Sequence, residues 1–241
     1  MLPNEPRPPK CFRDAGFDLK DFRADEEVAR QLYRAVGTEA ESLAEHHTAD
    51  GVHSYYVLLD RTATWGIPGE PQLIAVHLQR DWEQRTFIPA YSVLPLPQLA
   101  QSWLIRRGCP PDALQLDAGS PQPADWATRD LASRLVRDGT RYVMRESYTD
   151  DHNDVVVVVL EDPDAQARAP FRVVVEEFDV DAMTFTLREG AFAEFADASV
   201  WCWERIVGEA GPLPPVRPAA APRTAAPPTA PAVSRAPGRA P

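Results

Sequence analysis

The hydrophobic positions of this chain follow a helical spacing first and a strand spacing afterwards. Between residues 25 and 47, apolar side chains recur every three or four positions, which predicts an amphipathic helix. These side chains are Val28, Leu32, Val36, Ala40 and Leu43. Runs of β-branched and aromatic residues then predict three strands, and a second helix follows at about 97–107. The strands are expected at 54–60, 72–79 and 85–94.

The same order of elements begins again after a connector at 109–122. Helices are predicted at 123–138 and at about 191–207, the latter with an apolar side of Phe192, Phe195, Ser199, Trp203 and Ile206. The strands between them are expected at 141–148, 155–161, 171–178 and 182–189. Strands joined by short loops pair as antiparallel meanders. The pattern therefore predicts an α+β protein of two helix–antiparallel-meander–helix halves packed together, which share element order without evident sequence identity.

Both ends of the chain differ from the body in composition. Residues 212–241 hold ten prolines and hardly any bulky apolar side chain, so this tail is predicted to be disordered with polyproline II character. The first ten residues are predicted to be flexible for the same reason. The expected organisation is a flexible N-terminus at 1–10, a first half at 11–108, the connector at 109–122, a second half at 123–211 and a basic Pro/Ala-rich tail at 212–241.

The net charge of the chain argues against two classes of binding partner, nucleic acids and membranes. The chain carries a formal net charge of -11, and since its tail holds four arginines and no acid, residues 1–211 carry -15. Such a surface repels phosphate backbones and anionic lipid, which argues against nucleic-acid and membrane binding. No apolar run is long enough to span a bilayer, so a cytoplasmic protein is expected. Only Lys10 and Lys20 are lysines among 25 basic residues, a bias typical of a high-GC bacterium.

Motifs for cofactors and nucleophiles are missing from the sequence. It contains no GxGxxG, GxxxxGK[ST] or GxSxG pattern, and no cofactor is predicted. Cys11, Cys109 and Cys202 lie far apart without zinc-ribbon spacing, so they are expected to be reduced. Cys202, between two tryptophans, is predicted to be a buried thiol.

The stretch EHHTADGVH at 45–53 has two interpretations. Gly51 after histidines is typical of a helix end, which would explain the whole stretch. Alternatively, His47, Asp50 and His53 could hold zinc or another transition metal, because imidazole and carboxylate groups are its usual ligands.

A second acidic stretch, YTDDHND at 148–154, lies between two predicted strands. Asp150, Asp151 and Asp154 could bind magnesium or calcium through oxygen ligands, but the EF-hand glycine and terminal glutamate are missing. Asp and Asn are also the usual residues of hairpin turns, and the turn is the favoured interpretation.

Glu146 is the candidate catalytic residue. In strict alternation with Tyr142, Met144 and Tyr148, it falls on the apolar side of its strand, where desolvation would raise its pKa and suit a general acid. Glu176 or Glu177 could supply a second carboxylate. The alternatives are that this side of the strand faces water, or that Glu146 pairs with an arginine such as Arg172.

The tail offers a candidate binding motif. Pro212, Pro215, Arg217 and Pro218 could dock an aromatic groove as a polyproline II ligand, and a spacer without a partner is the alternative. The function predicted from these observations is a non-catalytic acidic protein-interaction module, of adaptor, chaperone-like or immunity type, whose partner is another protein. The tandem arrangement is similar to secretion-chaperone-like folds in architecture. The alternative function is a metal-assisted or carboxylate-based hydrolase.

Overall fold

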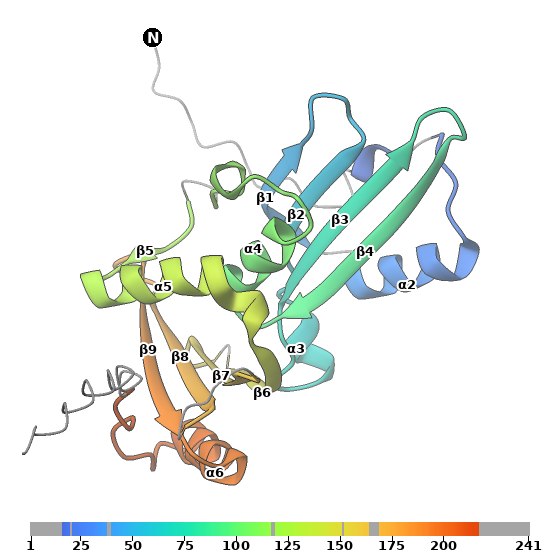
Figure 1. Cartoon of the computed structure of the whole chain (residues 1–241). Coiled ribbons are helices and arrows are strands. Elements are labelled where there is room, and N and C mark those ends of the chain that lie inside the picture. Colours follow the sequence, from blue (N-terminus) through green and yellow to red (C-terminus); the bar gives the residue numbers. More distant parts are fainter. Residues whose placement is uncertain are drawn as a thin grey trace, which may run out of the picture.

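The structure, a computed structural model, describes residues 16–19, 21–37, 40–116, 119–150, 152–163 and 169–216. It is an α+β protein with two β-sheets and helices on their faces (Figure 1). The N-terminus predicted at 1–10 and the tail from residue 217 onward lie outside the described residues.

The first sheet, sheet A, is an antiparallel meander of four strands in the order β1-β2-β3-β4. A helix precedes it, α2 (Glu26–Val36), and a helix follows it, α4 (Pro97–Ile105). A short helix, α3 (Ala63–Gly66), lies in the connection between the second and third strands. The strands are β1 (Glu41–His47), β2 (His53–Leu59), β3 (Leu73–Asp81) and β4 (Thr86–Leu94).

The second sheet, sheet B, has five strands in the order β5-β9-β8-β7-β6. Helix α5 (Trp126–Asp138) precedes its four-strand meander, and helix α6 (Phe195–Ile206) follows it. The meander strands are β6 (Val143–Asp150), β7 (Val155–Glu161), β8 (Phe171–Asp179) and β9 (Thr184–Phe192). The two-residue strand β5 (Gln122–Pro123) pairs parallel to β9 and falls in the predicted connector. The described part of the chain also contains the 3-10 turns η1 (Gly16–Asp18), η2 (Pro111–Ala113) and η3 (Gly139–Arg141).

The helix predicted over 25–47 is wrong in its second half. Helix α2 ends at Val36, where Gly37 takes a φ of 64° and donates its N–H to the carbonyl of Tyr33. The chain then enters β1, whose pairing with β2 skips a residue between Ser42 and Ala44. The apolar spacing continued across this break because α2 and Ala40 contribute to the same core cluster. The periodic spacing of apolar residues reflects the core that both segments share. It does not show where the helix ends and the strand begins.

Among the described residues, four apolar clusters fill the spaces between sheets and helices. On sheet A, one cluster joins the sheet to α2 and to the segment from Phe17 to Ala24, and the other joins it to α4. On sheet B, one joins the sheet to α4 and α5, and the other joins it to α6. Helices α4 and α5 therefore lie between the two sheets, while α2 and α6 lie on outer sides of the molecule (Figure 1). Strand β7 is covered on both faces, since Val156 to Leu160 are all buried.

The two sheets are held together at α4 and at the loop between β2 and β3. Leu99 of α4 shares a cluster with Leu131 and Leu135 of α5, and Ser102 Oγ accepts a hydrogen bond of 3.1 Å from the N–H of Thr140. At the other contact, the N–H of Thr149 donates to the carbonyl of Gly69 at 3.1 Å. This bridge covers one end of the edge strand β6.

The described chain after α6 packs back on sheet B. Trp201 Nε1 donates to the carbonyl of Gly211 at 3.1 Å, and Ala191 donates its N–H to the carbonyl of Pro214 at 3.2 Å. Leu213 packs against the cluster between α6 and the sheet. Residues 211–214 therefore belong to the packed structure, although the tail was predicted to begin at 212.

Gly190 makes room for this segment. A Cβ at Gly190 would lie 2.6 Å from Leu213 Cδ2 and 3.2 Å from the carbonyl oxygen of Pro214. Gly190→Val is therefore expected to displace residues 211–214 and to cost about 1–3 kcal/mol of stability, as overpacking does. Limited proteolysis after Gly211, together with urea unfolding, measures both effects. Gly119→Val is the control because its Cβ would meet nothing within 4 Å; equal protection of both variants would contradict the prediction.

Candidate functional site

Two adjoining pockets form a groove between sheet B and the C-terminal end of α6, called the α6 groove below. The first encloses about 470 Å³ and the second about 330 Å³. Both are lined by Glu177, Arg205 and Gly208. The groove is thus continuous across the ion pair that the Arg205 guanidinium forms with the Glu177 carboxylate.

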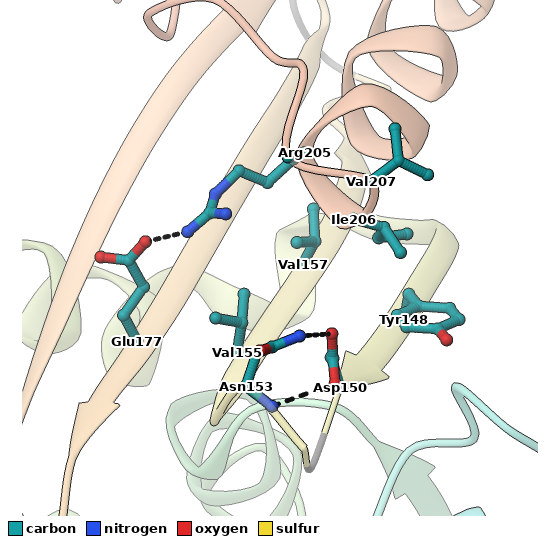
Figure 2. A pocket seen from close by; sticks show the side chains of 10 residues that line it. Tyr148, Asp150, Asn153, Val155, Val157, Glu177, Arg205, Ile206 and Val207 are labelled. Atoms are coloured by element: carbon teal, nitrogen blue, oxygen red, sulfur yellow. Dashed lines mark hydrogen bonds and ion pairs between the residues drawn. The ribbon is translucent and has the colours of Figure 1, made fainter.

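Apolar and polar side chains share the first pocket (Figure 2). Val155 and Val157 of β7 form its floor, and Ile206 and Val207 come from the end of α6. The second pocket continues toward β9, where Arg188, Trp201 and Leu213 line it. A ligand in this groove would contact the sheet, the helix end and the docked segment after α6.

The charges around the first pocket favour a cation. Two carboxylates, those of Asp150 and Glu177, and a single guanidinium, that of Arg205, line this pocket. The C-terminal end of α6, where the helix dipole is negative, also lies at this pocket, which Ile206 and Val207 line. Arg188 of the second pocket is already engaged, since it donates to Asp125 Oδ2 at 2.6 Å. A basic side chain of a ligand is therefore the best match for the first pocket.

Helix α6 has a second apolar side that faces away from the sheet. Val200, Trp203 and Val207 are 56%, 64% and 46% exposed. At 100° per residue they fall within about 60° of arc, opposite the buried Ala198 and Cys202. Of the apolar side predicted for this helix, Phe192 and Phe195 pack in the cluster against sheet B, whereas Trp203 is exposed. The i, i+3, i+7 spacing of the exposed residues was visible in the sequence, but it does not tell which of two stripes meets the core.

Glu146 is not desolvated. It is exposed on β6, because the pairing with β7 skips Arg145: Met144 pairs with Leu160, and Glu146 pairs with Val159. The bulge reverses the alternation, so Met144 and Glu146 lie on opposite faces of sheet B. The environment that would make Glu146 a general acid is missing from this position.

Its suggested partners lie apart from it. Arg172 and Glu176 each lie two residues from Val174 on β8, so their side chains share its face of the sheet, toward α4 and α5. Glu146 lies on the opposite face, toward α6. Glu177 shares that face, but it pairs with Val155, four residues along β7 from the partner of Glu146. At strand spacing this separation is roughly 13 Å, too far for the paired carboxylates of glycoside hydrolysis.

Among the described residues, the carboxyl whose pKa is raised is that of Glu176. It is 1% exposed and accepts a hydrogen bond of 3.5 Å from Gln98 Nε2. Burial raises its pKa from 4.5 to about 8, and the hydrogen bond from Gln98 opposes that rise. Glu176 Oε2 and Gln98 Oε1 have no partner among the described residues. A proton on Glu176 would make it and Gln98 a neutral acid–amide pair, which is the state that the raised pKa favours at neutral pH.

The stretch EHHTADGVH forms a β-hairpin, and its interpretation as a helix end is wrong. His47 Nδ1 lies 2.7 Å from Ser54 Oγ, and its ring contacts Tyr56 on the α2 face of sheet A. His53 contacts Tyr55 on the α4 face. The sheet therefore separates the two histidines.

Asp50, the third metal candidate, lies in the hairpin turn. It accepts hydrogen bonds from Thr48 Oγ1 at 2.5 Å and from the N–H of Val52 at 2.9 Å. The bond from Thr48 is the largest cause of its lowered pKa. Among the residues that the structure describes, no group of three or more His, Cys, Asp or Glu side chains is placed to hold a metal ion.

A histidine pair that sequence reasoning did not find lies on the α4 face. His53 Nδ1 is 3.1 Å from His77 Nε2, and the His77 ring stacks on Tyr55 at 4.7 Å between centroids. Burial, with the neighbouring His53 and Arg107, lowers the pKa of His77 to about 4. The register between β2 and β3 creates this contact, and no local pattern encodes it.

The turn interpretation of YTDDHND is confirmed. Asp150 Oδ1 accepts hydrogen bonds from the N–H groups of His152 and Asn153, each at 3.1 Å. Asn153 Nδ2 donates to Asp150 Oδ2 at 2.7 Å, and Asp154 takes a φ of 54°. Asp151 lies outside the described residues.

Cys202 is the buried thiol that the sequence predicted. Burial, with a smaller effect of Glu146, raises its pKa to about 12, and burial raises that of Cys109 to about 11. Neither thiol is suited to act as a thiolate nucleophile at neutral pH. Cys11 lies outside the described residues.

The structure describes only the first part of the candidate tail motif, up to residue 216. Pro212 lines the second pocket, and Pro215 follows the segment that packs on β9. Arg217 and Pro218 lie beyond the last described residue, so the polyproline ligand stays a prediction. No helix in the described part of the chain is both long and apolar enough to cross a membrane. No family model, curated protein or solved structure matches the chain.

Proposed function

We propose that this protein is a non-catalytic protein-interaction module, of adaptor, chaperone-like or immunity type, that binds another protein through α6. The observation that carries the proposal is the exposed apolar stripe of Val200, Trp203 and Val207. An exposed group of large apolar side chains is typical of a protein–protein contact, and tryptophan is a frequent anchor at such contacts.

The stripe adjoins the α6 groove, which enlarges the surface available to a partner. Val207 belongs to both, since it also lines the first pocket. The pocket favours a basic side chain, and Asp197 and Glu204 lie beside the stripe on the helix surface. The partner surface is therefore apolar with basic residues at its margin.

The spacing of the elements supports the further proposal that the chain is a duplicated helix–four-strand–helix unit. β3 and β4 begin at residues 73 and 86, and β8 and β9 begin at 171 and 184, which is 98 positions later in both cases. α4 and α6 begin at 97 and 195, again 98 positions apart. Both meanders also carry a bulge after the second residue of their first strand. Such a duplication would account for the two packed halves that the sequence predicts.

A photo-crosslinking experiment tests the proposal. Replacing Trp203 by p-benzoylphenylalanine in the full chain is expected to trap a discrete partner, which is then purified and titrated. Val200→Glu is expected to weaken that complex at least tenfold, since it places a charge in an apolar contact. Ile88→Glu, at a 69% exposed position on sheet A, is the matched control and should leave the affinity unchanged.

The same photo-crosslinker in place of Trp65, which is 80% exposed, controls for indiscriminate trapping. If positions 65 and 203 trap the same set of proteins, or if Val200→Glu binds as the wild type does, the proposal fails.

A further inference from the structure

The inner sides of α4 and α6 correspond residue by residue. Ala100, Trp103 and Leu104 of α4 pack on sheet A, and Ala198, Trp201 and Cys202, each 98 positions later, pack on sheet B. Both alanines are fully buried. The two helices therefore sit on their sheets in the same rotation.

Because the rotation is the same, the outer sides also correspond. The outer side of α4 is the one that holds the second sheet: Leu99 packs with α5, Ser102 accepts from Thr140, and Gln98 reaches Glu176. The equivalent positions on α6 are 196, 197 and 200, and all three are exposed. Helix α6 thus presents to solvent the side with which α4 binds its neighbouring helix and sheet.

The residues on the two outer sides differ in a way that defines the occupant. Val200 stands at the place of Ser102, and Trp203 stands at the place of Ile105, so the α6 side is more apolar. Asp197 stands at the place of Leu99, and Glu204 adds a second acid beside the stripe. An occupant therefore needs apolar residues opposite Val200 and Trp203 and basic residues opposite the two acids.

A second copy of this chain does not meet these requirements. In a self-association through α6, Asp197 and Glu204 would face like charges between two acidic bodies. In a head-to-tail arrangement, α6 would need the sheet A face that corresponds to the α4-covered face of sheet B. That face already holds Phe17, Leu19 and Phe22, and Phe17 is held there by a hydrogen bond of 2.6 Å from Arg80 to its carbonyl.

We infer that the outer side of α6 receives a basic amphipathic helix of a partner protein, seated as α5 is seated on α4. The inference rests on the proposed function and adds the kind of element that the partner supplies. Its basis is the equivalence of α4 and α6 together with the acidic margin of the stripe.

A peptide derived from α5 is the probe. Residues 126–141, carrying Asp130→Lys and Asp138→Lys and a fluorescent label, form an amphipathic helix with a basic margin. Anisotropy titration with the full chain is expected to detect binding, which Val200→Glu weakens at least tenfold and Ile88→Glu leaves unchanged. A second peptide with Ser133→Pro, which breaks the helix, is expected to lose binding by the same factor.

Four results would overturn the inference. Equal binding of the proline peptide would mean that the site takes an extended segment. Tenfold tighter binding by a 1–216 truncation than by the full chain would identify the tail as the occupant. A dimer in sedimentation analysis that Val200→Glu dissociates would identify a second copy. If no peptide binds at millimolar concentration while position 203 still traps a partner, the helical mode is wrong and the proposed function stands.

Discussion

Replacing Glu176 by glutamine is expected to stabilise the protein by about 3 kcal/mol at pH 7. The buried carboxyl must take up a proton when the chain folds, because burial raises its pKa from 4.5 to about 8. Glutamine keeps the shape, pairs its amide with that of Gln98 and takes up no proton. Urea unfolding of both proteins at several pH values measures the difference.

The sign of the pH dependence follows from the same pKa. Below pH 4.5 the carboxyl is protonated in both states, and its ionisation affects stability little. As the pH rises from about 4.5 to 8, the unfolded chain releases the proton while the folded chain keeps it, so wild-type stability falls. Glu176→Gln should abolish this slope. Glu146→Gln, at an exposed position, is the control, and equal slopes for Glu176→Gln and wild type would refute a neutral buried Glu176.

Gly69→Val is expected to destabilise the protein by about 3 kcal/mol. Gly69 takes a φ of 87°, which a β-branched residue rarely adopts, and a Cβ there would lie 2.6 Å from Tyr148 Cε2. The variant would also strain the hydrogen bond from the N–H of Thr149 to the carbonyl of Gly69, which joins the two sheets. Thermal and urea unfolding measure the loss.

Tyr148 lines the first pocket of the α6 groove, so the Gly69→Val variant can also be tested by the affinity for a partner. Displacing its ring should weaken a partner that enters the groove, in addition to lowering stability. Gly66→Val lies in the same loop, and its Cβ would meet nothing within 4 Å. The explanation by steric conflict at Gly69 would be wrong if the two variants were equally stable.

The repeat of elements shows how one misplaced boundary changes a whole interpretation. The sequence pattern predicted three strands in the first half and four in the second. Once α2 ends at Val36 and β1 begins at Glu41, both meanders have four strands. The boundary between α2 and β1 could not be seen in the apolar pattern, because Ala40 continues the helical spacing of Leu32 and Val36. Spacing records which residues face a core, and two different elements here face the same one.

The candidate catalytic residue fails for a comparable reason. Alternation along β6 placed Tyr142 and Tyr148 on one face, but the bulge at Arg145 puts them on opposite faces. A bulge carries no strong sequence signature. A single inserted residue therefore decided the face on which Glu146 lies, whereas Glu176 on β8 is buried and contacts a helix residue 78 positions away.

The sequence by itself determined the α+β class, most strands of both sheets and the buried Cys202, because these depend on local composition and on apolar runs. β7 was predicted with its observed bounds, 155–161. Only the tertiary structure decided which side of α6 meets the sheet, which carboxyl is neutral, and that His47 and His53 lie on opposite faces. Those outcomes depend on pairing register, bulges and contacts between distant segments, which no local pattern records. The exposed stripe of α6 became a candidate binding surface only when its other side was found against the core.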